Sequence, residues 1–188
     1  MSVSRRDFVK NVSLVSAGFG LLQPFDLTAQ SGAPQLRLGF IGVGLRGQSH
    51  LQMCLERSDV TVKVICDVDD RMLGMSKDLI RKSGKPMPEI VTGSDTAYRE
   101  MLNPDKIDAV IIATPWEWHK PMITDSISAG LKYIATEVVL GITLEDHWEV
   151  VRAAEAAGAH VMMLENACYR RDILAILNMV RQGLFGEL

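Results

Sequence analysis

The stretch that decides the fold is Leu36–Gly47, LRLGFIGVGLRG. Its first half, residues 36–41, is a mostly apolar run without helical periodicity, which predicts a buried parallel strand. A helical pattern over residues 48–57 follows. Between them stand the glycines of a G-x-G-x-x-G motif, which are Gly42, Gly44 and Gly47. In such a turn the first glycine permits the bend, the second lets the backbone approach a pyrophosphate, and the third lets the helix pack on the strand.

The residues that follow turn this motif into a specific prediction. A second expected strand, residues 60–66, ends at Asp67, about 20 residues beyond the motif, where a dinucleotide-binding fold places an acceptor for the adenosine ribose hydroxyls. The helix N-terminus would face the phosphates with its N–H groups and positive dipole end. An acid at this position favours NAD, because it would repel a 2′-phosphate. The alternative is an ordinary strand–helix–strand unit with a glycine-rich turn.

The bulk composition excludes several classes of protein. The chain has 188 residues and a formal net charge of −3, with no basic stripe interleaved with aromatics, so nucleic acid is not an expected partner. Cys54, Cys66 and Cys168 are odd in number and form no C-x-x-C pair, which favours buried thiols over a disulfide or a metal site. No run of 18 apolar residues follows residue 30, so no membrane span is expected there.

Residues 1–30 are typical of a targeting segment. Ser4–Lys10, SRRDFVK, resembles the twin-arginine export consensus, with valine in place of leucine. A weakly apolar stretch over residues 12–22 and a small-residue site near Thr28-Ala29 follow. We therefore expect export of a folded protein to the periplasm or beyond. The alternative is a disordered or amphipathic N-terminus with a chance Arg-Arg pair.

The rest of the chain alternates between strand and helix patterns. Further strands are expected at residues 90–91, 107–113, 132–136 and 159–164, and helices at 69–82, 92–102, 121–129, 143–157 and 171–181. Thr143 and Asp146 form a plausible capping pair for the helix that they begin. Alternating strands and helices with right-handed crossovers predict an α/β fold with a doubly wound parallel sheet of the Rossmann type.

Polar and aromatic residues stand where three of these strands end. In a doubly wound sheet, ligands bind at the carboxyl ends of the strands. Trp116–His119, WEWH, therefore falls where the nicotinamide half of the cofactor would lie, and Glu137 and Glu165-Asn166 end the next two strands. The alternatives are core packing for the tryptophans, a helix start for His119 and a helix-capping acid for Glu137.

The combined pattern resembles a known family. GxGxxG, the acid after the second strand, ATPxxxH and a strand-end glutamate are similar to the Gfo/Idh/MocA superfamily of NAD(P)-dependent sugar oxidoreductases. More narrowly, RRDFVK, GVGLRG, TPWEWHKPM, ATEVV and MMLENACYRRDILAILNMVRQGLFGEL resemble glycoside hydrolase family 109, the NAD-dependent α-N-acetylgalactosaminidases. The resemblance covers practically the whole chain, and WEWH and LENACYRRD are its specific parts.

The resemblance implies a set of cofactor contacts. Leu45 and Arg46 would touch the diphosphate beside the three glycines, and Asp67 would hold the adenosine ribose. The residues implied on the nicotinamide side are Trp116, Glu117, Trp118, His119, Glu137, Val138 and Asn166. Dehydrogenases of the superfamily usually read E-K-P where this chain has Glu137-Val138-Val139. Val138 cannot assist proton transfer as that lysine does, which agrees with the glycosidase branch.

The resemblance also implies the chemistry. NAD would take a hydride from C3 of an α-linked N-acetylgalactosamine, the acidified C2 proton would leave, and the enolate would expel the C1 substituent. Water would then add and the hydride would return. This route differs from the usual pair of carboxylates. The alternatives are an exported NAD-dependent sugar dehydrogenase and a non-catalytic nucleotide-binding remnant.

The expected domain organisation has three parts. Residues 1–30 form the signal segment, 35–167 the NAD-binding Rossmann domain, and 168–188 the first helix of a truncated α+β substrate domain. The resemblance implies that this further domain supplies the sugar-site groups, so we assign no catalytic residue and no metal, and any homo-oligomer would form through it. An amphipathic helix over residues 171–181, with apolar residues that nothing covers, points to truncation.

Overall fold

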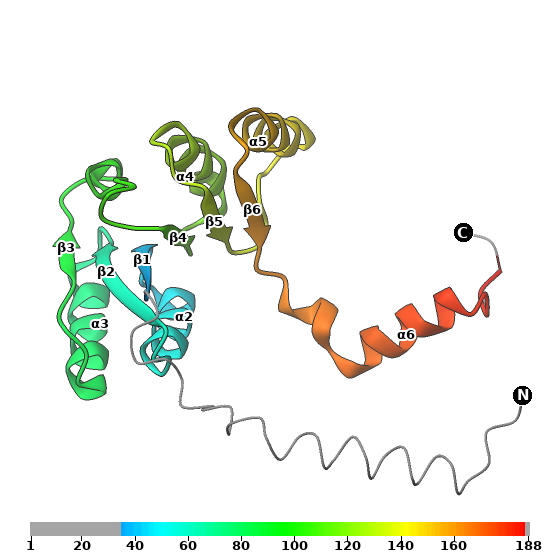
Figure 1. Ribbon diagram of the computed structural model, residues 1–188, viewed down its shortest axis with the longest axis horizontal. Coiled ribbons are helices and arrows are strands. Elements are labelled where there is room, and N and C mark those ends of the chain that lie inside the picture. Colours follow the sequence, from blue (N-terminus) through cyan, green and yellow to red (C-terminus); the bar gives the residue numbers. More distant parts are fainter. Residues whose placement is uncertain (1–34, 187–188) are drawn as a thin grey trace, which may run out of the picture. The chain divides into compact units, whose positions relative to one another are not determined.

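A six-stranded parallel sheet forms the centre of the protein (Figure 1). The computed structural model describes residues 35–186. The strands are β1 Leu36–Ile41, β2 Val60–Cys66, β3 Glu89–Val91, β4 Ala109–Ile112, β5 Tyr133–Thr136 and β6 His160–Met163. Their spatial order is β3-β2-β1-β4-β5-β6, and every neighbouring pair is parallel. The order reverses direction at β1, which confirms the prediction of a doubly wound Rossmann-type sheet.

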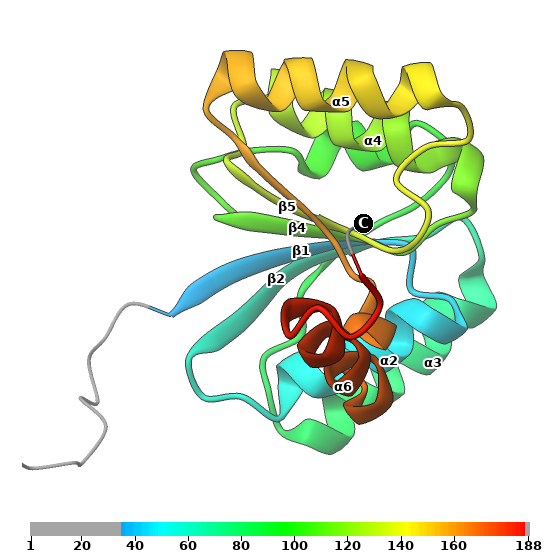
Figure 2. The ribbon, with the colours of Figure 1, turned by 90° about the vertical axis from the view of Figure 1, so that its right-hand side faces the viewer.

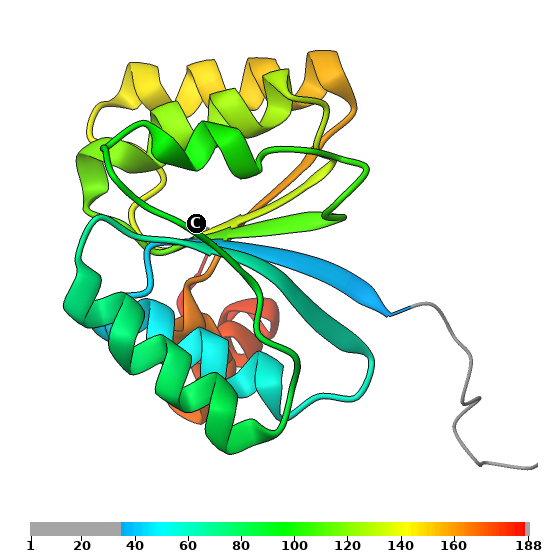
Figure 3. The same ribbon diagram turned by 90° about the vertical axis from the view of Figure 1, so that its left-hand side faces the viewer.

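Helices cover both faces of this sheet. The covering helices are α2 Leu45–Leu55, α3 Asp70–Ser83, α4 Trp116–Ser128 and α5 Leu144–Ala157, with the short 3-10 helix η1 Ala97–Met101. After β6 come the 3-10 helix η2 Asn166–Tyr169 and the helix α6 Arg171–Arg181, which bury no residue. Figures 2 and 3 show α2 and α3 on one face and α4 and α5 on the other. None of the helices in residues 35–186 has the length and apolar character needed to cross a membrane.

Two apolar clusters, one on each face, hold the layers together. Phe40 and Ile65 point from the sheet toward α2 and α3, whereas Val110 and Ile112 pack with residues of α4 and α5. All four side chains are completely buried. Burial of a side chain of this size stabilises the fold by about 1.5–3 kcal/mol. Because both faces are covered, β1 and β2 end in runs of consecutive buried residues, which are 38–41 and 64–66.

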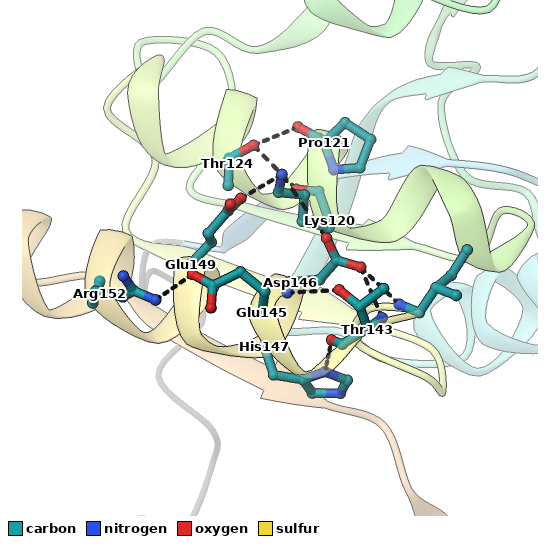
Figure 4. Close-up of polar contacts among 10 residues, drawn as sticks. Lys120, Pro121, Thr124, Thr143, Glu145, Asp146, His147, Glu149 and Arg152 are labelled. Atoms are coloured by element: carbon teal, nitrogen blue, oxygen red, sulfur yellow. Dashed lines mark hydrogen bonds and ion pairs between the residues drawn. The ribbon is translucent and has the colours of Figure 1, made fainter.

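Polar contacts fix the N-terminal end of α5 and join this helix to α4 (Figure 4). The Thr143 side chain accepts a hydrogen bond from the Asp146 N–H, and the Asp146 carboxylate accepts from the Thr143 N–H, which confirms the predicted capping pair. Lys120 of α4 forms an ion pair with Glu149 of α5. These contacts hold α4, and with it the segment that follows β4, in a fixed position.

The structure corrects three expectations about helices. The helix expected over residues 92–102 is only η1, because Gly93, with φ of 115°, and a turn up to residue 96 precede it. α4 begins at Trp116 rather than at Pro121, and Pro121 lies inside it, where its missing N–H removes one backbone hydrogen bond. α2 begins at Leu45 rather than at residue 48, so the last residues of the glycine motif form its first turn.

The expectation of buried thiols holds in full for one of the three cysteines. Cys66 is buried, Cys54 is only half-buried, and Cys168 is exposed because it lies in η2 outside the core. β6 is an edge strand, and Met162 on it is 53% exposed. The apolar residues of α6 are exposed as expected, namely Ile173, Leu174, Ile176 and Leu177. The predicted export segment lies outside the described residues.

Candidate functional site

The glycine turn after β1 is built by close backbone contacts. Gly42 has φ of 84°, and a Cβ atom there would lie 2.6 Å from the carbonyl oxygen of Ala113 at the end of β4. A Cβ atom on Gly47 would lie 2.1 Å from the carbonyl oxygen of Gly42. Only glycine fits either position. The loop at Gly42 packs directly against the end of β4, and the first turn of α2 packs directly against that loop. A Cβ atom on Gly44, in contrast, would meet no atom within 4 Å.

The first turn of α2 points its N–H groups at this open space. Gly44 caps the helix without a side chain, and its carbonyl oxygen accepts a hydrogen bond from Gln48 N–H at 2.8 Å. Within residues 35–186, the N–H groups of Leu45, Arg46 and Gly47 have no hydrogen-bond acceptor. Unpaired N–H groups at the positive end of a helix dipole bind anions.

Asp67, at the end of β2, borders the same space. One of its carboxylate oxygens accepts a hydrogen bond from Val43 N–H at 2.7 Å, and the other accepts from Asp69 N–H at 2.9 Å. The first of these bonds braces the glycine turn. Each carboxylate oxygen can accept a second hydrogen bond, so the brace leaves capacity for the hydroxyl groups of a ribose.

A cavity of about 310 Å³ runs along the ends of β1, β2 and β4. Gly42, Gly44, Asp67 and Trp118 line it. Sequence reasoning missed other lining residues, which are Val68, Ser94, Asp95, Tyr98 and Thr114. The loop from Ser94 was hidden by the expected helix over residues 92–102, although the turn-forming residues at 93–95 were a signal of it.

Tyr98 lines this cavity, and its hydroxyl group is held by a hydrogen bond. Its side chain is 1% exposed, and its hydroxyl donates a hydrogen bond to an Asp125 carboxylate oxygen at 2.7 Å. Burial, aided by this hydrogen bond, raises the pKa of Tyr98 to about 12. Tyr98 is therefore neutral at physiological pH and serves as a rigid boundary.

The four residues Trp116–His119 lie in different surroundings. Successive helical residues point about 100° apart, so the first turn of α4 distributes these side chains. Trp116 is 60% exposed, Glu117 is exposed, and Trp118 lines the cavity. His119 is fully buried, with Nε2 2.8 Å from the Thr114 carbonyl oxygen and Nδ1 against that of Val139. Its side chain ties together the segments after β4 and β5, and the cofactor contacts expected of these four residues stay predictions.

Glu137, at the end of β5, is held by two residues of α2. Its Oε1 atom accepts from Arg46 Nε at 2.7 Å and lies 2.6 Å from His50 Nε2, and the Val138 N–H donates to Oε2 at 3.3 Å. Burial opposes ionisation of Glu137, but the hydrogen bonds from Arg46 and His50 outweigh it, so its pKa lies below the ordinary value. The ionised carboxylate only accepts, and His50 Nε2 is therefore the donor.

A second cavity of about 530 Å³ lies between α2 and the segment after β6. Arg46 and His50 line it from α2, and the exposed residue Asn166 lines it from η2. Arg46 thus links the two parts of this region, because it lines the cavity with Asn166 and donates a hydrogen bond to Glu137. His50 was missed by the sequence analysis, although its position one turn after Arg46 was a signal.

These features fit a dinucleotide at the carboxyl edge of the sheet. The space beside Gly44 is open because this residue has no Cβ atom, and the unpaired N–H groups of α2 border it. Both features suit a diphosphate. The Asp67 carboxylate stands beside it at the position for a ribose. Asp67 follows β2, on one side of β1, whereas Trp118 and Glu137 follow β4 and β5, on the other side.

Comparisons with known proteins agree with this geometry. Residues 36–165 match the Gfo/Idh/MocA family, described as an oxidoreductase family with an NAD-binding Rossmann fold. Over its whole length the chain is 44% identical to a glycosyl hydrolase family 109 protein of Stenotrophomonas maltophilia and covers 41% of it. It is also 40% identical to an α-N-acetylgalactosaminidase of Shewanella oneidensis, of which it covers 44%. The chain spans less than half the length of these curated relatives.

Solved structures show the same fold. A scyllo-inositol dehydrogenase from Lactobacillus casei with bound NAD(H) and scyllo-inositol superposes with a TM-score of 0.67 at 18% identity, over 81% of this chain and 43% of that one. A myo-inositol 2-dehydrogenase from Lactobacillus plantarum gives a TM-score of 0.66 at 22% identity, over 82% and 43%.

Proposed function

The chain belongs to the Gfo/Idh/MocA family of oxidoreductases with an NAD-binding Rossmann fold, and we propose that it is the cofactor-binding part of an NAD-dependent glycosidase. The proposed substrate is a carbohydrate with α-linked N-acetylgalactosamine. The open cradle over Gly44 at the N-terminus of α2 carries the cofactor part of the proposal. The glycosidase part is supported by relatives named α-N-acetylgalactosaminidase that are 38–40% identical over the whole chain.

The residues of this chain would hold and orient the cofactor. Unpaired N–H groups of Leu45, Arg46 and Gly47 would bind the diphosphate, and Asp67 would bind the adenosine ribose. Trp118 and the ionised Glu137 would border the nicotinamide side. The other predicted contacts remain part of the proposal, namely those of Trp116, Glu117, His119, Val138 and Asn166.

When bound, NAD would accept a hydride from C3 of the sugar and return it at the end of the cycle. The C3 ketone acidifies the C2 proton, its removal lets the C1 substituent leave, and addition of water completes hydrolysis. No net oxidation occurs, so the site needs to retain its cofactor rather than exchange it. We assign the proton transfers to no described residue.

Residues 1–30 are proposed to direct export by the twin-arginine route. That route carries folded proteins, so the cofactor could be inserted before the protein leaves the cytoplasm. Replacing Arg5 and Arg6 together by lysine should retain the protein in the cytoplasm, measured by cell fractionation. Unchanged export of this variant would contradict the proposal.

Titration of the purified chain with NAD, followed by tryptophan fluorescence, tests the cofactor site. We expect a saturable change that disappears in Trp118→Phe, because Trp118 lines the cavity. The matched control Trp148→Phe, on the far helix α5, should keep the change. A flat signal in the unaltered chain would overturn the cofactor site.

An assay of the gene product that contains these residues tests the reaction. Release of p-nitrophenol from p-nitrophenyl α-N-acetylgalactosaminide without net NADH is the expected result. Stoichiometric NADH from a free sugar would instead identify a sugar dehydrogenase. Neither product from a protein that binds NAD would identify a non-catalytic nucleotide-binding protein.

A further inference from the structure

Arg46, His50 and Glu137 form a cluster in which one carboxylate oxygen has two donors. We propose that His50 is a positioning residue: it holds the Glu137 carboxylate in place when the Arg46 guanidinium turns from Glu137 to the cofactor diphosphate. This inference rests on the proposed cofactor site and adds a residue to it.

The two donors differ in their freedom to move. Arg46 and His50 occupy positions i and i+4 of α2, so both side chains lie on the same face of the helix. The Arg46 side chain is 48% exposed, whereas the His50 side chain is 12% exposed and that of Glu137 10%. Arg46 can therefore change partner through solvent, and His50 is packed beside the carboxylate.

Arg46 is also placed to serve the diphosphate. It lies in the first turn of α2, among the N–H groups that have no acceptor within residues 35–186. A guanidinium has five N–H donors and binds phosphate oxygens in pairs. In the structure, Arg46 Nε donates a hydrogen bond to the Glu137 carboxylate. A bound diphosphate would thus compete with Glu137 for this cation.

When the Arg46 guanidinium moves away, the largely buried Glu137 carboxylate loses one charge-assisted hydrogen-bond partner. A buried carboxylate that loses its last such partner is strongly disfavoured. His50 Nε2, at 2.6 Å, remains as a donor and keeps the Glu137 charge satisfied. Without His50, Arg46 would stay on Glu137, and the diphosphate would bind less tightly.

Equilibrium binding of NAD to single and double variants tests this inference. We expect His50→Leu to weaken NAD binding about tenfold, and His50→Gln to bind nearly as tightly as the unaltered chain, because the glutamine amide can donate from a similar position. In the background of Arg46→Met, His50→Leu should cause little further loss, since it acts through the release of Arg46. A control, His147→Leu on the exposed surface of α5, should bind NAD unchanged.

The outcomes separate this inference from the cofactor proposal. Adenosine, which carries no phosphate, should bind equally to all variants and reports that they are folded. If His50→Leu fails to fold, His50→Asn, whose amide is too short to reach Glu137, takes its place with the same expected loss. The role of His50 would be overturned if His50→Leu or His50→Asn bound NAD as tightly as the unaltered chain, or if the losses in the double variant were additive. Either result would leave the proposed cofactor site intact. Failure of the unaltered chain to bind NAD would overturn the cofactor site.

Discussion

The two ends of the cofactor cleft are built in different ways. The turn after β1 is shaped by backbone contacts among Gly42, Gly47 and the end of β4, and it is braced by the Asp67 carboxylate. The opposite end is shaped by side chains from distant segments: Arg46 and Glu137, which share a hydrogen bond, are 91 positions apart in sequence. A site made by backbone geometry can be recognised in a short motif, whereas one made by side-chain partners depends on the finished fold.

Gly47→Ala should break the backbone-built end and have the largest effect. The added Cβ atom would lie 2.1 Å from a backbone oxygen that cannot move away. We expect a loss of about 3 kcal/mol in the free energy of unfolding, measured by urea denaturation. The control Gly74→Ala in α3, where a Cβ atom meets nothing within 4 Å, should raise stability by about 0.5–1 kcal/mol. Equal stability of Gly47→Ala and the unaltered chain would contradict the observed packing.

Gly44→Ala, in the same glycine turn, should weaken NAD binding without changing the stability of the fold. Its Cβ atom would enter open space, so stability should stay within about 0.5 kcal/mol of the unaltered chain. NAD affinity should fall about tenfold, or about 1.4 kcal/mol, because the methyl group occupies the space proposed for the diphosphate. Calorimetric titration measures this change. Unchanged affinity would place the diphosphate elsewhere.

Thr143→Ala alters the N-terminal end of α5, outside the cofactor cleft, and should therefore change stability without changing NAD binding. Loss of the capping hydrogen bond to Asp146 N–H should cost about 1 kcal/mol in the free energy of unfolding. NAD affinity should not change, because α5 contributes no residue to the 310 Å³ cavity. A weakened affinity would show that the α4–α5 contacts in Figure 4 reach the site.

Glu137→Gln should give the smallest effect, visible in its pH dependence. The pKa of Glu137 lies below its ordinary value of 4.5 in the folded protein, so its ionised form adds stability above about pH 4.5 that is lost as pH falls through the folded pKa. The stability difference between Glu137→Gln and the unaltered chain should therefore be constant near neutrality and narrow in acid. Denaturation at several pH values measures it. A stability difference that stays constant into acid for Glu137→Gln would contradict the ion pair.

The sequence predicted the sheet well because its signals are local. Strands β1 and β2 are mostly apolar and end in consecutive buried residues, and the glycine spacing reflects contacts within a few residues. The start of α2 was predicted three residues late, which left Arg46 outside the helix and concealed that His50 lies on the same face. The burial of His119 also depends on Val139, which follows a different strand, and no local pattern contains that contact.

The hydrogen bond from Val43 N–H to Asp67 has a thermodynamic consequence for association. It sets the shape of the turn during folding, so little backbone entropy remains to be lost when a nucleotide arrives. Preorganisation of this kind increases affinity by lowering the cost of ordering rather than by adding contacts. Slow release of the nucleotide, which the proposed reaction requires, would then follow from this rigidity of the unliganded turn.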